Sequence, residues 1–144
     1  MNFTEEINGL SIPQALIVSI QNGSWSTPQD LTVWYALFPR AEVVQPKLYS
    51  LDQIKSENRG WRVELEPSYL GKANHEAKPG DIDPTRSLLI GDLGPDRLIA
   101  LDYRESMNRP SVAFLTGDND SHWVKIVPDI EALIGGLKLR PPNR

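Results

Sequence analysis

Four short apolar runs in the second half of the chain restrict the fold more than any other feature of the sequence. The segments between them are rich in Gly, Pro, Asn and Asp, the residues that form tight turns. Connections this short join antiparallel neighbours, because a parallel crossover needs about a dozen residues or more. We therefore predict a β-meander with strands at 87–90, 97–102, 110–115 and 122–126.

The first half predicts a helix over residues 12–21. Ser11 and Gln14 have the spacing of a capping box, and Pro13 falls in the first turn, where its missing N–H costs nothing. Asn22-Gly23 supplies a left-handed stop. The apolar positions recur with helical spacing and form one face: Ile12, Ala15, Leu16 and Ile20.

Three further elements are predicted before residue 66. Residues 31–38 (LTVWYALF) are rich in β-branched and aromatic side chains and precede a proline, which favours a strand. A second short strand is predicted at 47–49. Ser50 and Gln53 form another capping box, so a short helix should begin there and stop at 58–60 (NRG).

Residues 66–86 contain several prolines and glycines without a sustained period and predict a long surface loop. A closing helix is predicted at 128–137, because Pro128 suits a first turn, and Asp129 and Glu131 suit the positive end of the helix dipole. The order of elements indicates an α+β fold, with a mainly antiparallel sheet flanked by helices.

Composition excludes several classes of function. The chain has 144 residues, 40% of them apolar, which predicts one domain with one core. It has no cysteine, so it can form neither a disulfide nor a thiolate metal site. The net charge of −4 and the scattered basic residues argue against nucleic-acid binding, which needs a clustered positive face.

The sequence also predicts a cytoplasmic protein with no membrane association. Residues 1–10 carry two glutamates and lack the basic start and apolar run of a secretory signal. The apolar run of residues 15–18 is far too short to span a bilayer.

Three segments together resemble the SUKH superfamily, which includes fungal cell-wall synthesis regulators and many bacterial immunity proteins. They are 12–25 (IPQALIVSIQNGSW), 47–54 (KLYSLDQI) and 90–134, which begins IGDLGPDRLIALD. The resemblance implies a single domain over 1–144 with a central, mainly antiparallel sheet. Three residues depart from the family's pattern: Ser24 and Pro95 stand where glycine is common, and Ile130 where phenylalanine is common.

No recognised catalytic or metal-binding spacing is present, so we predict no enzyme activity, no cofactor and no metal. Residues 118–122 (DNDSH) offer oxygen and imidazole ligands, but such runs more often close turns. A carboxylate pair among Asp92, Asp96 and Asp102 would be needed for glycoside hydrolysis. Strand termination and turn capping are the better explanation of these aspartates.

The leading hypothesis is a protein-binding domain, most simply an immunity protein that neutralises a cognate bacterial toxin by direct binding. One alternative is an adaptor of the cell-wall synthesis regulator type. Another is a small carbohydrate-binding protein or hydrolase that uses the aspartates or His122. Trp34 and Trp123 are predicted to be core residues in strands. The predicted partner-binding residues are the other two tryptophans and three aspartates at turn tips: Trp25, Trp61, Asp92, Asp96 and Asp118.

Overall fold

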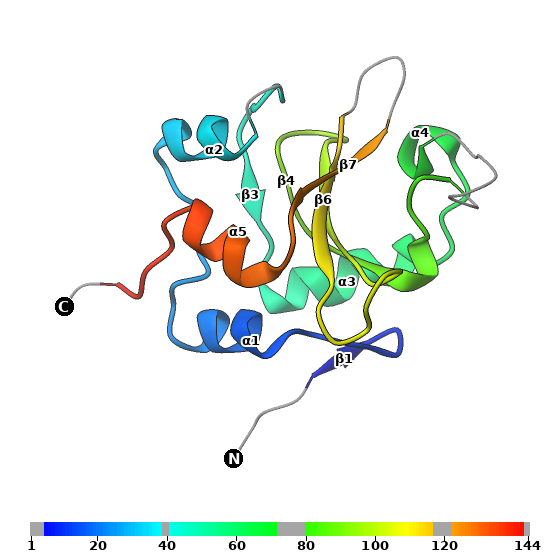
Figure 1. The fold of residues 1–144 in the computed structure, drawn as a ribbon, viewed down its shortest axis with the longest axis horizontal. Helices are drawn as coiled ribbons and strands as arrows, with labels where there is room; N and C mark the ends of the chain where they lie inside the picture. The colour runs from blue at the N-terminus through cyan, green and yellow to red at the C-terminus, as the bar shows by residue number, and fades with distance from the viewer. Residues whose placement is uncertain (1–4, 39–40, 72–79, 117–121, 143–144) are drawn as a thin grey trace.

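The protein is built around a five-stranded antiparallel sheet (Figure 1). The computed structural model describes residues 5–38, 41–71, 80–116 and 122–142. The sheet has the order β3-β4-β5-β6-β7, so the predicted meander is confirmed and the short strand predicted at 47–49 is added beside its first strand. The strands are β3 (Lys47–Leu48), β4 (Ser87–Asp92), β5 (Leu98–Asp102), β6 (Ser111–Leu115) and β7 (Trp123–Val127).

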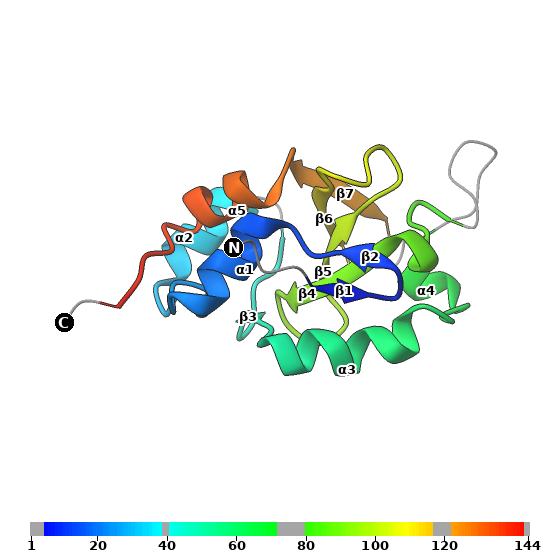
Figure 2. The same ribbon diagram turned by 90° about the horizontal axis from the view of Figure 1, so that it is seen from below.

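Helices cover both sides of the sheet, which confirms the α+β class. Three of them, α1 (Gln14–Gln21), α2 (Leu31–Leu37) and α5 (Ile130–Gly136), gather on one side, and α4 (Pro67–Leu70) lies on the other (Figures 1 and 2). Helix α3 (Leu51–Trp61) packs along β4. All residues of β6 are consequently buried.

The short hairpin of β1 (Glu6–Ile7) and β2 (Leu10–Ser11) precedes the first helix. The helix predicted at 12–21 is confirmed as α1, but its capping box is wrong. Ser11 lies in β2, and the N-cap residue of α1 is Pro13, with no side-chain cap. The helix stops where predicted, because Gly23 takes the left-handed conformation, with φ of 82°.

Residues 31–38 do not form the predicted strand. They form α2, because the Asp30 carboxylate accepts a hydrogen bond from the Thr32 N–H (3.0 Å) and caps the helix. Trp34 and Phe38, four residues apart, are both fully buried, and their rings stack at 6.1 Å. The segment therefore buries a helical stripe rather than alternate residues.

Two further boundaries differ from expectation. Helix α3 begins at the predicted cap, where Ser50 Oγ accepts from the Gln53 N–H, but it continues past 58–60 to Trp61. The segment 66–86 is not simply a surface loop. Its described residues include α4 and the 3-10 turn η1 (Pro84–Arg86), and the side chains of Leu70, Ile82 and Pro84 are buried.

Asn58 explains why α3 passes its predicted stop. Its side chain is fully buried and faces β4 rather than turning the chain. The Nδ2 group donates to the carbonyl oxygens of Ile54 (2.7 Å) and Leu89 (2.9 Å), and Oδ1 accepts from the Leu89 N–H (2.8 Å). The amide thus pairs with β4 much as another strand would.

The closing helix α5 lies within the predicted range and begins at a well-satisfied cap. Asp129 accepts a hydrogen bond from the Ala132 N–H (2.9 Å) and two from the Arg109 guanidinium (2.8 and 3.0 Å). These bonds lower the pKa of Asp129 below its ordinary value, and the bond from the Ala132 N–H has the largest effect. The cap also ties the β5–β6 connection to the helix.

Gly91 allows β3 to approach β4. A Cβ atom at this position would lie 2.6 Å from the carbonyl oxygen of Lys47, which belongs to the backbone and cannot swing away. The Gly91→Ala variant should therefore lose about 1–3 kcal/mol of unfolding free energy in a urea titration. Gly135→Ala is the matched control. Its Cβ would meet nothing within 4 Å, so it should be neutral or stabilise by up to about 1 kcal/mol. Equal effects of the two substitutions would contradict the close approach.

Candidate functional site

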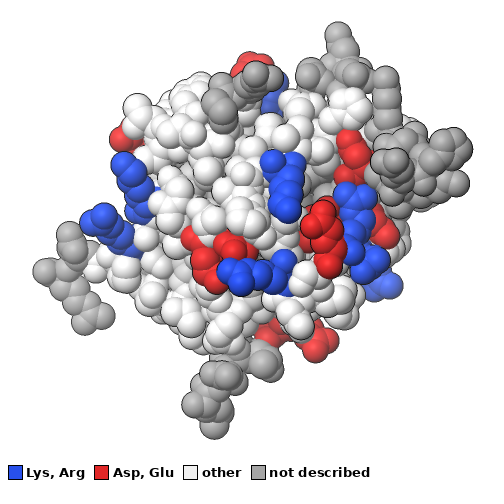
Figure 3. Space-filling model, viewed as in Figure 1, with Lys and Arg blue, Asp and Glu red and all other residues white. Residues whose placement is uncertain are grey.

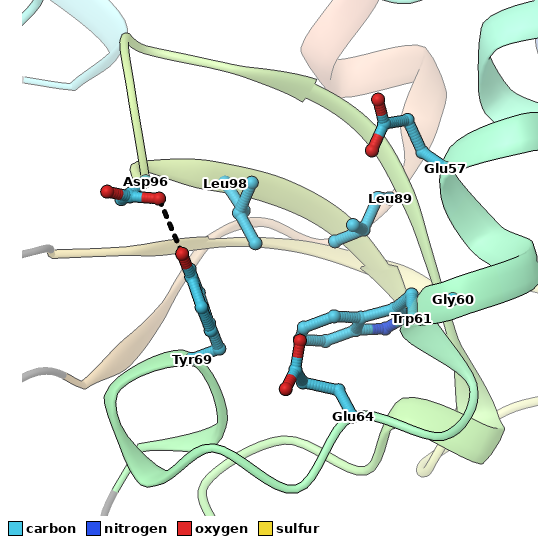
Figure 4. Close-up of a pocket in the computed structure, with 8 residues that line it drawn as sticks. All are labelled: Glu57, Gly60, Trp61, Glu64, Tyr69, Leu89, Asp96 and Leu98. Carbon is cyan, nitrogen blue, oxygen red and sulfur yellow. Dashed lines mark hydrogen bonds between the residues drawn. The ribbon is translucent and has the colours of Figure 1, made fainter.

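A pocket of about 350 Å³ opens between α3, α4 and the β4–β5 hairpin (Figure 4). Its apolar side chains come from α3 and from the β4–β5 hairpin, which lie far apart in the sequence, and three of its other residues are acidic. The lining residues are Glu57, Gly60, Trp61, Glu64, Tyr69, Leu89, Asp96 and Leu98. We call this cavity the α3–α4 pocket.

Trp61 forms one wall of the pocket, and Leu89 and Leu98 point into it from the sheet (Figure 4). The tryptophan is only 4% exposed, because its ring packs 5.9 Å from the ring of Trp123. Its indole N–H donates to Ser87 Oγ (2.9 Å). This wall is therefore fixed by core packing before any ligand arrives.

Tyr69 and Asp96 close the opposite side of the pocket. The phenolic O–H of Tyr69 donates to Asp96 Oδ1 at 2.6 Å, which joins α4 to the β4–β5 turn. This hydrogen bond raises the pKa of the Tyr69 phenol. Asp96 sits in the left-handed region, with φ of 63°, a conformation that aspartate tolerates better than most residues. The turn thereby presents its carboxylate to the pocket.

Two large apolar side chains lie in the connection from α3 to α4, on either side of the pocket residue Glu64. Val63 is 69% exposed and Leu65 is 83% exposed. Single exposed apolar residues are common on protein surfaces. A pair beside an apolar pocket is more informative, because contiguous apolar surface marks interaction sites.

The structure brings together two of the predicted partner-binding residues and separates the others. Trp61 and Asp96 line the same pocket. Trp25 is 9% exposed and donates its indole N–H to the Tyr49 carbonyl oxygen (2.8 Å) away from the pocket. Its role in binding, like that of Trp61, stays a prediction.

Asp92 has a structural partner, whereas Asp118 lies outside the described residues. The Asp92 carboxylate accepts hydrogen bonds from the Tyr49 phenol (2.8 Å) and the Gly94 N–H (3.1 Å). Burial raises the pKa of Asp92, and these two hydrogen bonds partly offset the effect. Its contribution to binding stays a prediction as well.

The sequence reasoning missed Glu57, Glu64 and Tyr69. Glu57 precedes Gly60 and Trp61 by three and four residues, so helical spacing places it on their flank of α3. That spacing was readable from the sequence, whereas Glu64 follows the end of α3. Tyr69 could not have been found in this way, because its partner Asp96 is 27 residues away.

Asp92 and Asp102 do not form the carboxylate pair of a glycoside hydrolase. Asp92 pairs with Leu98 and Asp102 pairs with Ser87, at opposite ends of the β4–β5 hairpin. Four residues of strand separate Leu98 from Asp102, a rise of about 13 Å. Glycosidase carboxylates lie roughly 5–9.5 Å apart. Asp102 is moreover engaged by the Arg104 guanidinium at 3.0 Å.

The described parts of the chain also bear on metal, membrane and nucleic-acid binding. No three His, Cys, Asp or Glu side chains in these ranges are grouped so as to hold a metal ion. None of the helices found there is both long and apolar enough to cross a membrane. Acidic and basic side chains are interspersed on the face in Figure 3, without a continuous basic area.

The chain matches a known protein family over most of its length. The model of the SMI1 / KNR4 family (SUKH-1) matches residues 2–136, nearly the whole chain. No curated protein and no solved structure matches significantly. The residues that matched the pattern in the sequence, such as Gly91 and Gly23, have the structural roles described above.

Proposed function

Because the chain belongs to the SMI1 / KNR4 family (SUKH-1), we propose that it is a non-catalytic domain that binds a cognate bacterial toxin and neutralises it by occlusion. The family includes immunity proteins. Occlusion requires a surface complementary to the toxin and no chemistry of its own. The observation that carries the proposal is the combination of this membership with an apolar pocket beside exposed apolar side chains.

The binding surface that we propose consists of the α3–α4 pocket together with Val63 and Leu65. Protein interfaces have a desolvated apolar centre and a polar rim, and a few central residues supply most of the affinity. The pocket and the two side chains supply such a centre. Glu57, Glu64 and Asp96 supply an acidic rim that complements a basic toxin surface.

Co-expression with the toxin domain encoded by a neighbouring gene tests the proposed function. The two proteins should co-purify as a stoichiometric complex, and the domain should protect cells from the toxin. Absence of both the complex and the protection would overturn the immunity role.

The double variant Val63→Ser, Leu65→Ser tests the proposed surface. Truncation of central interface residues costs about 2 kcal/mol or more, so the affinity for the toxin should fall about 30-fold or more in calorimetry. The melting temperature should hardly change, because both side chains are exposed. Leu31→Ser in α2, where the side chain is 43% exposed, is the matched control and should leave binding unchanged. Equal losses in the two proteins would place the interface elsewhere.

A further inference from the structure

Three carboxylates line the α3–α4 pocket. Glu57 lies on the pocket flank of α3 and Glu64 in the connection after this helix, whereas Lys55 and Arg59 lie on the other flank of α3 by helical spacing. Within the described part of the chain, no Lys, Arg or His forms an ion pair with Glu57, Glu64 or Asp96.

Two cations of the described elements around the pocket are paired with glutamates outside it. Lys55 pairs with Glu5 at 2.7 Å, and Arg97, next to Asp96 in the sequence, pairs with Glu42 at 2.9 Å. Neither of these two cations pairs with a carboxylate of the pocket. A ligand that brings a positive charge into the pocket would gain Coulomb energy from its carboxylates.

In the described part of the chain, two of the rim carboxylates, those of Asp96 and Glu64, each accept hydrogen bonds through one oxygen only. Asp96 accepts from Tyr69 through Oδ1. Glu64 accepts from the N–H groups of Leu65 and Glu66 through Oε2, both at 3.2 Å. Among the described residues, the second oxygen of each carboxylate receives no hydrogen bond. These second oxygens can therefore accept hydrogen bonds from a ligand that carries several N–H donors.

The apolar lining of the pocket favours one kind of cation. Trp61 forms one wall, Leu89 and Leu98 point into the pocket from the sheet, and Tyr69 lies on the opposite side (Figure 4). A hydrated metal ion would gain nothing from this apolar surface. An arginine side chain matches both parts, because its methylene stem packs on apolar surface, whereas its planar guanidinium stacks on aromatic rings and binds carboxylates in a bidentate manner.

We propose that the α3–α4 pocket receives an arginine side chain of the protein partner. The inference rests on the proposed function, since the arginine is presented by the bound toxin, and it names the recognition element. Val63 and Leu65 then contact the apolar residues that flank this arginine. The acidic rim also explains why a net negative domain would find a basic partner quickly.

A titration with a blocked peptide tests the pocket without the toxin. The probe is acetyl-Leu-Arg-Leu-amide, added to the ¹⁵N-labelled full chain and followed by NMR. The indole N–H signal of Trp61, assigned by its loss in Trp61→Phe, and the amides of Glu64 and Asp96 should shift and saturate. Binding should weaken at high salt, because the pocket is solvent-accessible.

Two comparisons identify the charge as the cause. A citrulline peptide has nearly the same shape without the charge and should bind at least about tenfold more weakly. The triple variant Glu57→Gln, Glu64→Gln, Asp96→Asn should lose binding to the same extent, whereas the control Asp52→Asn, Glu131→Gln should retain it. Both control residues are exposed and outside the pocket.

The outcomes separate this inference from the immunity role. Absence of saturable shifts, or equal binding of the citrulline peptide, overturns the arginine pocket. If the arginine peptide binds but no toxin complex forms, the pocket stands and the immunity role falls. If a toxin complex forms and the triple variant binds the toxin as tightly as the natural protein, the pocket is not the site used.

Discussion

The Asn58→Ala variant is expected to lose about 2–5 kcal/mol of unfolding free energy, although no apolar contact of note is removed. The substitution deletes the partner of the Leu89 N–H and of the Leu89 carbonyl oxygen, both of which face the buried amide. An unsatisfied buried polar group costs about 1–3 kcal/mol, and here two are created. Such a loss is a large fraction of the stability of a small domain.

Chemical denaturation in urea, monitored by tryptophan fluorescence, measures this loss. Ser56→Ala is the matched control in the same helix, because Ser56 is exposed and its hydroxyl bonds only the Gln53 carbonyl oxygen. The control should change stability by less than about 0.5 kcal/mol. A loss for Asn58→Ala as small as that of the control would mean that water satisfies the Leu89 groups, and the amide would not be needed to join α3 to β4.

The sheet was predictable because its signals are local. Each meander strand is a short apolar run bounded by turn residues, and the short connections leave only antiparallel pairing. The helix at 31–37 was not predicted, because composition was weighed above periodicity. Asp30 at the cap and the spacing of Trp34 and Phe38 indicate a helix, but β-branched and aromatic residues have only a weak preference for strands.

The candidate site was predictable only in part, because it is assembled by tertiary contacts. Trp61 was singled out as a large side chain after Gly60, and Asp96 as a turn residue, but nothing in the sequence places them in one pocket. Trp25 follows a helix stop in the same manner as Trp61 follows a glycine. It is nevertheless buried against Tyr49, because its indole N–H finds a backbone acceptor there. Burial depends on such distant partners.

Trp61→Ala is expected to cost about 3–5 kcal/mol of unfolding free energy, the usual range for a truncated core tryptophan. The ring is 4% exposed, packs on Trp123 and satisfies its N–H through Ser87. If Trp61 acted only as a surface anchor for a partner, its removal would leave stability within about 0.5 kcal/mol of the natural protein. Thermal and urea unfolding of the isolated domain therefore distinguish the two roles.

Because the alanine variant would weaken partner binding through unfolding alone, the contribution of Trp61 to the pocket has to be measured with Trp61→Phe. Phenylalanine keeps an aromatic ring, and Ser87 Oγ retains its hydrogen bond to the Asp83 carbonyl oxygen (2.7 Å), so the stability loss should be much smaller than that of alanine. A folded Trp61→Phe protein with weaker affinity for the arginine peptide would show that this core residue also forms the wall on which the ligand packs. Unchanged affinity would confine Trp61 to the core and leave the recognition to Tyr69 and the acidic rim.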